Sequence, residues 1–271
     1  MQNPPAQPGW LQTVSTGWAA RAPVPFFNNR PARITGLQWL LLMAAVVAGS
    51  LVVTLPIPWP WLPVGRVVPA VLLAVIPLWA LRRVAPAHWT CLFAKVRARD
   101  VLWMVAFALL NIVVTVLVGL ALKSQMAEAP NPGTAMLQSA SAWERVAIFA
   151  NMAPQLLGEE LITILPFLAL MALFTQRWGA SRKVALVGAW LVSATLFGLM
   201  HLPTYGWNVV QCLAIIGTAR LVLTLPWIMT KNLWVSTGAH IINDWTPVWA
   251  GAAERRGGFI GSAGKFALSL V

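Results

Sequence analysis

The sequence has very little charge and few of the residues that soluble proteins place at their surfaces. Only 10% of its 271 residues are charged, whereas soluble domains average about 25%, and 59% are hydrophobic. This deficit excludes a soluble enzyme, a disordered chain and a coiled coil. The only two cysteines, Cys91 and Cys212, lie far apart, which excludes a disulfide framework and a cysteine-based metal motif.

What the sequence has instead is a series of long apolar runs. They cover about residues 34–55, 64–81, 101–122, 146–174, 184–202, 206–229 and 232–250. Each is close to or above the ~20 residues that a helix needs to cross a bilayer, and none alternates as a barrel strand would. The sequence therefore predicts an all-α, polytopic transmembrane bundle of seven spans, with residues 257–271 left open as a short eighth helix.

Polar segments flank the predicted bundle at both ends. Residues 1–33 are rich in proline and bury too little apolar surface to fold alone, so we expect a flexible tail there. The bundle is assigned to residues 34–250, with the core motifs in 145–250. Residues 251–271 are expected to form a C-terminal tail or a short extra helix.

The basic residues predict how the bundle is oriented. The net charge is +12, but the Lys and Arg residues lie between apolar runs and form no stripe. This pattern favours contacts with anionic lipid over binding of nucleic acid. Because they concentrate before the first run and in every second loop, we expect a cytoplasmic N-terminus in a bacterial inner membrane.

Ionisable residues inside the apolar runs are the main sign of function. They are Glu159 and Glu160 in the fourth run, His201 at the end of the fifth, Arg220 in the sixth, and His240 and Asp244 in the seventh. A charged side chain at the bilayer centre costs at least ~2.5–3.5 kcal/mol, so such residues indicate a functional site. A structural network of buried salt bridges is the alternative interpretation.

Distances from the turns predict which of these residues meet. Glu159 and His201 are equally far from the turn between the fourth and fifth runs, so we expect them at one depth of a helical hairpin. Arg220 and Asp244 are equally far from the turn between the sixth and seventh runs. His240 lies four residues before Asp244 and therefore on the same helix face.

These residue types suit the hydrolysis of a peptide bond. Glu159 can take a proton from water, and His201 at its level can hold that water or pass the proton to the leaving amine. His240 can donate to the developing oxyanion while Asp244 fixes its ring. Two histidines and a glutamate also resemble a zinc site, but the compact His-Glu-x-x-His helix is missing. We therefore expect no metal and no cofactor, with zinc as the alternative.

Three segments resemble the ordered motifs of the CAAX protease and bacteriocin-processing family, also called CPBP or Abi. They are GEEL at 158–161, FGLMH at 197–201 and HIIND at 240–244, which resemble the family's di-glutamate, Phe-x-x-x-His and His-x-x-x-Asn/Asp motifs. The resemblance covers about residues 145–250 and implies an intramembrane endopeptidase that acts on a peptide or protein at the membrane.

The same resemblance implies a role for each residue. It makes Glu159 the residue that activates water and His201 its partner, with Glu160 in a more structural role. His240 and Asp244 correspond to the pair that binds and polarises the scissile carbonyl group.

The sequence departs from the family pattern at one position. The first motif usually continues as Glu-Glu-x-x-x-Arg, but the residue at the arginine position is Ile164. Because Arg220 stays charged in lipid, it needs a carboxylate, and we expect it to replace the motif arginine by pairing with Asp244, Glu160 or both. A non-catalytic immunity or scaffold protein of the same fold stays open. A proton-coupled transporter is a further alternative, although the sequence shows no repeated halves.

Overall fold

The computed structural model describes residues 24–55, 57, 67–124, 129, 131, 136, 137 and 140–255. These residues form helices and connecting turns, and no strand occurs among them. The long helices are α1 (Gly36–Thr54), α2 (Val67–Val84), α3 (Ala98–Leu122), α5 (Ala142–Ala172), α6 (Arg182–Met200), α7 (Thr218–Thr230) and α8 (Leu233–Arg255). Three short helical segments accompany them: η3 (Trp89–Leu92), η4 (Leu173–Arg177) and η5 (Gln211–Gly217). The predicted fold class, a polytopic helical bundle, is confirmed.

Each predicted apolar run corresponds to a helix. Among the described residues, six helical segments are long and apolar enough to cross a membrane, and α8 is not one of them. α8 contains His240, Asn243 and Asp244, three of the polar residues discussed below. The proposed eighth helix at 257–271 lies outside the described residues.

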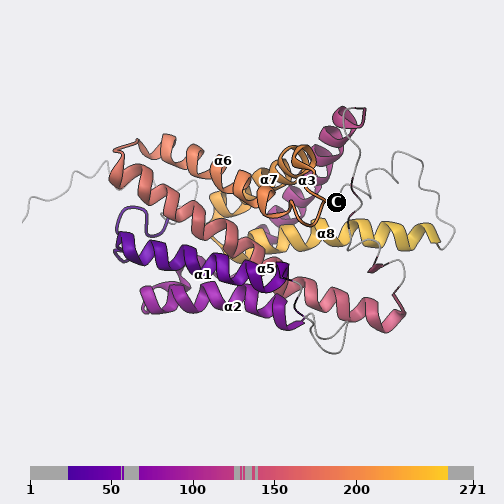
Figure 1. The fold of residues 1–271 in the computed structure, drawn as a ribbon, viewed down its shortest axis with the longest axis horizontal. Helices are drawn as coiled ribbons and strands as arrows, with labels where there is room; N and C mark the ends of the chain where they lie inside the picture. Colours follow the sequence, from indigo (N-terminus) through magenta and orange to yellow (C-terminus); the bar gives the residue numbers. More distant parts are fainter. Residues whose placement is uncertain are drawn as a thin grey trace, which may run out of the picture.

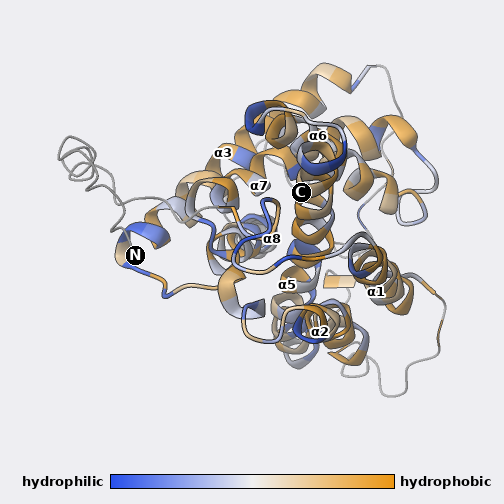
Figure 2. Cartoon of the chain, turned by 90° about the vertical axis from the view of Figure 1, so that its left-hand side faces the viewer, coloured by the Kyte–Doolittle hydropathy of each residue, from blue (hydrophilic) through white to orange (hydrophobic). Residues whose placement is uncertain are grey.

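α5 is the central helix of the bundle. In the apolar 18-residue window of its span Trp143–Arg177, 72% of the residues are buried, a larger share than in any other candidate span among the described residues. α5 packs against α1, α2, α6 and α8. Figure 1 shows α5 crossing between the α1–α2 pair and α6. Outer helices such as α1 and α3 instead expose rows of leucine and valine, and apolar colour dominates them in Figure 2. Such apolar outer faces are what lipid-facing helices require.

Two glycines bring the helices of the predicted site close to their neighbours. A Cβ atom on Gly158 of α5 would lie 2.5 Å from Leu73 Cγ of α2. A Cβ atom on Gly238 of α8 would lie 2.4 Å from Met104 Sδ of α3. The backbones of α5 and α8 are therefore set against α2 and α3 directly beside the residues predicted to be functional.

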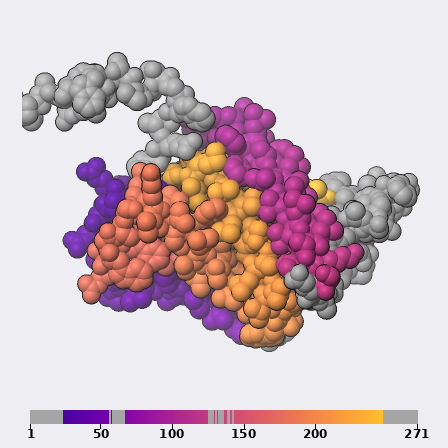
Figure 3. All heavy atoms as spheres, turned by 90° about the horizontal axis from the view of Figure 1, so that it is seen from above, coloured from indigo at the N-terminus to yellow at the C-terminus, as the bar shows by residue number. Residues whose placement is uncertain are grey.

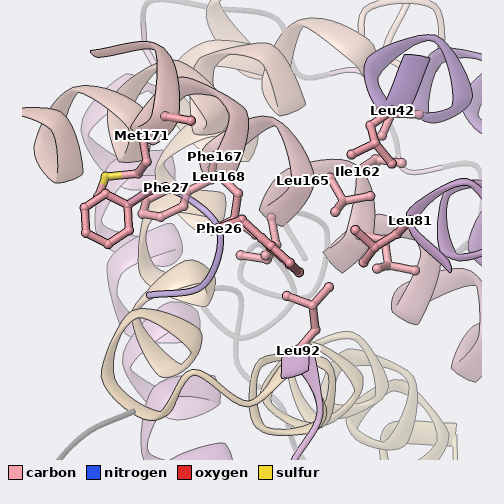
Figure 4. Close-up of a cluster of buried hydrophobic side chains, with 14 of the residues drawn as sticks. Phe26, Phe27, Leu42, Leu81, Leu92, Ile162, Leu165, Phe167, Leu168 and Met171 are labelled. Carbon is pink, nitrogen blue, oxygen red and sulfur yellow. The ribbon is translucent and has the colours of Figure 1, made fainter. Parts of the chain in front are cut away.

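The residues just before α1 belong to the hydrophobic core. Val24, Phe26 and Phe27 are buried, and Phe26 packs with residues of α5 in the cluster drawn in Figure 4. The side chains of Thr175 and Gln176 in η4 donate hydrogen bonds to the carbonyl oxygen of Phe27. The flexible tail expected for residues 1–33 therefore does not extend over 24–33, because the two phenylalanines supply the apolar area that the prolines do not. Residues 1–23 lie outside the described part.

Candidate active site

Three helices bring five of the six predicted residues into one cluster. Glu159 and Glu160 come from α5, Arg220 from α7, and His240 and Asp244 from α8. Glu160 and Arg220 are fully buried and His240 is nearly so, whereas Glu159 and Asp244 are half-buried. The cluster thus has a closed part and a part that reaches the surface of the described structure.

The closed part is an ion pair between Glu160 and Arg220. Arg220 Nη2 lies 2.6 Å from Glu160 Oε1, and both side chains have no exposed surface. Arg220 Nε also donates to Thr224 Oγ1, one turn along α7. The guanidinium carbon lies 5.0 Å from the centre of the Phe197 ring. The motif position is filled by Ile164, which is fully buried in the core. The pairing expected of Arg220 is therefore present, with Glu160 as its partner.

His240 lies between this ion pair and the two half-buried carboxylates. Its Nδ1 is 3.0 Å from Glu160 Oε1. Its Nε2 is 3.7 Å from Asp244 Oδ1 and 3.9 Å from Glu159 Oε2. One side of the ring is thus fixed by a buried carboxylate, and the other faces the groups that a substrate could reach.

Glu159 differs from Glu160 in its surroundings although the two are adjacent in the chain. Gln155 Nε2 donates to Glu159 Oε1 over 3.0 Å, and Oε2 faces His240. The Glu159 side chain is 13% exposed, whereas that of Glu160 is 0% exposed. Glu159 is therefore the one of the two carboxylates that water can contact.

His201 does not join the cluster directly. It follows the last residue of α6, and its Nδ1 donates to the carbonyl oxygen of Phe197 over 2.8 Å. Among the described residues it forms no ion pair with Glu159, so the equal depth expected from the sequence does not produce a contact. The reason is local: the ring turns back onto its own helix. Phe197 nevertheless links His201 to Arg220, because its ring lies against both side chains.

Two asparagines extend the cluster and were not identified from the sequence. Asn243 Nδ2 donates to Asp244 Oδ1 over 3.0 Å, and Asn111 Nδ2 of α3 donates to Asn243 Oδ1 over 2.9 Å. Both asparagines are buried. The sequence feature that could have indicated this extension of the cluster is Asn111 itself, because it places an amide side chain in the middle of the apolar run 101–122.

The arrangement of the acidic, histidine and cysteine side chains bears on whether the site can hold a metal ion. Within the described part of the chain, no group of three or more of these residues is placed so that it could hold a metal ion.

The comparison with protein families concerns the helices that build this cluster. Residues 141–246 match the family model described as type II CAAX prenyl endopeptidase, Rce1-like. The matched segment contains all three motifs and all six ionisable residues singled out above. The resemblance of this segment to the CAAX protease family is therefore confirmed.

The family match and the fold agree on the class of protein. The matched family model describes endopeptidases, and the six apolar helices among the described residues indicate an integral membrane protein. The helices α1, α2 and α3 lie outside the matched segment. A search of curated proteins and a search of solved structures each found no match.

Proposed function

We propose that this protein is an intramembrane endopeptidase that hydrolyses a peptide bond with a water molecule activated by Glu159. The observation that carries the proposal is the contrast between the two adjacent glutamates. Arg220 neutralises Glu160 in a fully buried ion pair, whereas Glu159 is partly exposed and faces His240. A carboxylate that water can contact and that no arginine pairs with is the group that general base catalysis requires.

The hydrolysis divides into two proton transfers. Glu159 takes one proton from water as the water oxygen attacks the scissile carbonyl carbon, and a tetrahedral oxyanion forms. His240 Nε2 faces the same space as Glu159 Oε2, and in the protonated ring it donates to this oxyanion. The proton held by Glu159 then passes to the amide nitrogen, the C–N bond breaks, and a carboxylic acid and an amine are released.

His201 completes the proposed set of reactive groups. Its Nδ1 proton is directed to the Phe197 carbonyl oxygen, which can only accept. Nε2 therefore has a lone pair available to hold the water or to relay the proton to the leaving amine. In this mechanism Asp244 orients His240, and Glu160 with Arg220 fixes the opposite side of its ring.

The test of the function is a comparison of cells that carry the wild type with cells that carry Glu159→Gln. Protein termini are mapped in both by mass spectrometry. We expect new termini only with the wild type, because glutamine cannot accept the water proton but keeps the size of the side chain. Glu144→Gln is the matched control, since Glu144 lies near the start of the same helix and a glutamine preserves its capping contact with Ser141. Identical termini in all three strains would contradict the proposal.

The zinc alternative is tested with the purified protein. A farnesylated peptide ending in a CAAX sequence is the first probe, because the matched family is described as CAAX prenyl endopeptidases. Activity should survive dialysis against a strong chelator. Loss of activity that one equivalent of zinc restores would instead assign His201 and His240 as ligands.

A non-catalytic protein of the same fold is the second candidate. It is favoured by the lack of contact between His201 and Glu159 and by Ile164 at the motif arginine position. The wild type would then cleave neither the farnesylated peptide nor any cellular protein. We also propose, from the distribution of basic residues, a cytoplasmic N-terminus in a bacterial inner membrane rich in anionic lipid.

A further inference from the structure

Two buried asparagines connect α3 to the cluster, although α3 lies outside the segment that matches the family. Asn111 donates to Asn243, and Asn243 donates to Asp244, over 2.9 Å and 3.0 Å. Asn111 is 1% exposed and Asn243 is 4% exposed. α3 packs along α8, as the adjoining surfaces of the two helices in Figure 3 show, and this packing places Asn111 behind the site.

Asp244 Oδ1 accepts from Asn243 and so sets the direction of both hydrogen bonds, and Asn111 holds Asn243 in that orientation by donating to its oxygen. The side-chain amide of an asparagine can turn by about 180° and exchange its oxygen and nitrogen with little change of shape. Asn243 presents its nitrogen to Asp244 while its oxygen accepts from the nitrogen of Asn111. In the opposite orientation the oxygen of Asn243 would face the carboxylate oxygen of Asp244, and the two acceptors would repel each other.

We propose that Asn111 is a positioning residue of the hydrolytic site, acting on Asp244 through Asn243. The inference rests on the function proposed above. Asp244 Oδ1 lies 3.7 Å from His240 Nε2, the nitrogen that faces Glu159. Without Asn111, the amide of Asn243 loses the donor that holds it, and its hydrogen bond to Asp244 loosens. A displacement of about 1 Å at a reacting group can lower a rate by as much as ~100-fold.

Thr115 provides a matched control on the same helix. It lies one turn beyond Asn111, is 2% exposed, and its hydroxyl group has no hydrogen-bond partner among the described residues. Thr115→Val therefore removes a buried polar group from the same face of α3 without touching the Asn111–Asn243–Asp244 chain. It should change kcat by less than about 2-fold.

The decisive experiment is a double-mutant cycle with the farnesylated CAAX peptide as substrate. Asn111→Leu should lower kcat by ~10–100-fold and change KM by less than about 3-fold. In an Asp244→Asn background the same change should lower kcat by less than about 3-fold, because an amide at position 244 can satisfy either orientation of Asn243. An unchanged kcat in Asn111→Leu, or an equal loss in both backgrounds, would overturn the positioning role.

A second readout does not depend on turnover. Thermal unfolding of the detergent-solubilised protein is measured for Asn111→Leu, Asn243→Leu and the double variant. If Asn111, Asn243 and Asp244 are hydrogen-bonded in series, the double variant should unfold at about the same temperature as the less stable single variant. The second change then removes a contact that is already lost. Strictly additive shifts of the unfolding temperature would contradict this series of hydrogen bonds. If Glu159→Gln has no effect on cleavage while the unfolding shifts stay non-additive, the proposed function fails and the contact chain stands.

Discussion

At the scale of single residues, the arginine that neutralises Glu160 comes from a different helix than the family motif leads one to expect. Arg220 is on α7, and the motif position on α5 holds the buried Ile164. A positive charge thus lies beside Glu160, but it comes from residue 220 and not from the motif position 164. Both partners are fully buried, and a buried charge without its partner is far less favourable than the intact pair.

Loss of Arg220 should therefore destabilise the protein. We expect Arg220→Leu to lower the free energy of unfolding by ~3–5 kcal/mol, because Glu160 is left charged in the core. Combining it with Glu160→Gln should recover part of this loss, since no unpaired charge remains. Thermal unfolding in detergent measures both effects. A single variant as stable as the wild type would show that the ion pair adds nothing to stability.

The residue Cys91 gives a prediction about pH outside the membrane-spanning helices. Cys91 lies in η3, and burial raises the pKa of its thiol from 9.0 to about 11. A pKa raised by two units lowers the fraction of reactive thiolate near pH 8 by about 100-fold. In a Cys212→Ala protein, alkylation of Cys91 should be slow at pH 8 and should accelerate as the pH approaches 11.

The unfolded chain serves as the control for Cys91. In denaturant the thiol returns to its ordinary pKa, so alkylation at pH 8 should be about 100-fold faster. The thiol is easier to ionise in the unfolded chain, so its contribution to stability is complete below pH 9 and is lost as the pH rises toward 11. Equal alkylation rates in the folded and unfolded protein would contradict the burial of Cys91.

At the scale of helices, the two glycine contacts differ in what a larger residue would meet. Gly158 faces the Cβ, Cγ and Cδ2 atoms of Leu73, which are close to the backbone of α2. Gly238 faces the Cγ, Sδ and Cε atoms of Met104, which form the flexible end of its side chain. The contact of α5 with α2 therefore has less freedom to adjust than the contact of α8 with α3.

Alanine substitutions should reveal this difference between the two helix contacts. Gly158→Ala should lower the free energy of unfolding by ~1–3 kcal/mol, because the added methyl group overpacks a rigid contact. Adding Leu73→Ala to the Gly158→Ala variant should restore part of the lost free energy of unfolding. Gly238→Ala is the matched control and should cost less, since Met104 can change rotamer. Thermal unfolding that ranks the two variants in the opposite order would contradict this account.

The helices themselves were predictable from the sequence, but several contacts were not. Long apolar runs predict helices because the backbone must satisfy its own hydrogen bonds in lipid. Counting residues from the turns gives depth along a helix but neither tilt nor rotation. For that reason the count placed Arg220 level with Asp244, whereas the ion pair of Arg220 is with Glu160. The count also could not show that the His201 ring forms a hydrogen bond with its own helix.

Other parts of the site depend on packing that no local pattern encodes. Asn111 acquires a role only because α3 lies against α8, and a single amide in an apolar run does not indicate its partner. Similarly, the proline content indicates an irregular segment before α1. It does not indicate that Phe26 and Phe27 pack against helices that come much later in the chain.

At the scale of the whole molecule, burial around the cluster is uneven along the bundle axis. Thr163, Thr224 and Ser236 lie about one turn from the cluster toward the end where α5 leads into η4, and all are fully buried. In the opposite direction, Gln155 and Asp244 are half-buried. Among the described residues, the cluster is therefore more open toward the end where α5 begins.

The segment before α1 contributes to the closed end, and its removal should be costly. Phe26 is 1% exposed and packs in the same hydrophobic core as α5, so Phe26→Ala should lower the free energy of unfolding by ~3–5 kcal/mol. Leu40→Ala is the control, because Leu40 of α1 is 68% exposed on the outer face and should change stability little. The unfolding temperatures of the two variants decide whether this segment is part of the core.

The position of Phe27 also has a consequence for the order in which the protein is made. Phe27 is synthesised well before η4, but its carbonyl oxygen accepts a hydrogen bond from Gln176, 149 residues later in the chain. The segment therefore cannot dock until α5 has been inserted and η4 has emerged. Until then its phenylalanines are available to chaperones and to the insertion machinery. A segment that is synthesised before α5 thus reaches its native place only after α5.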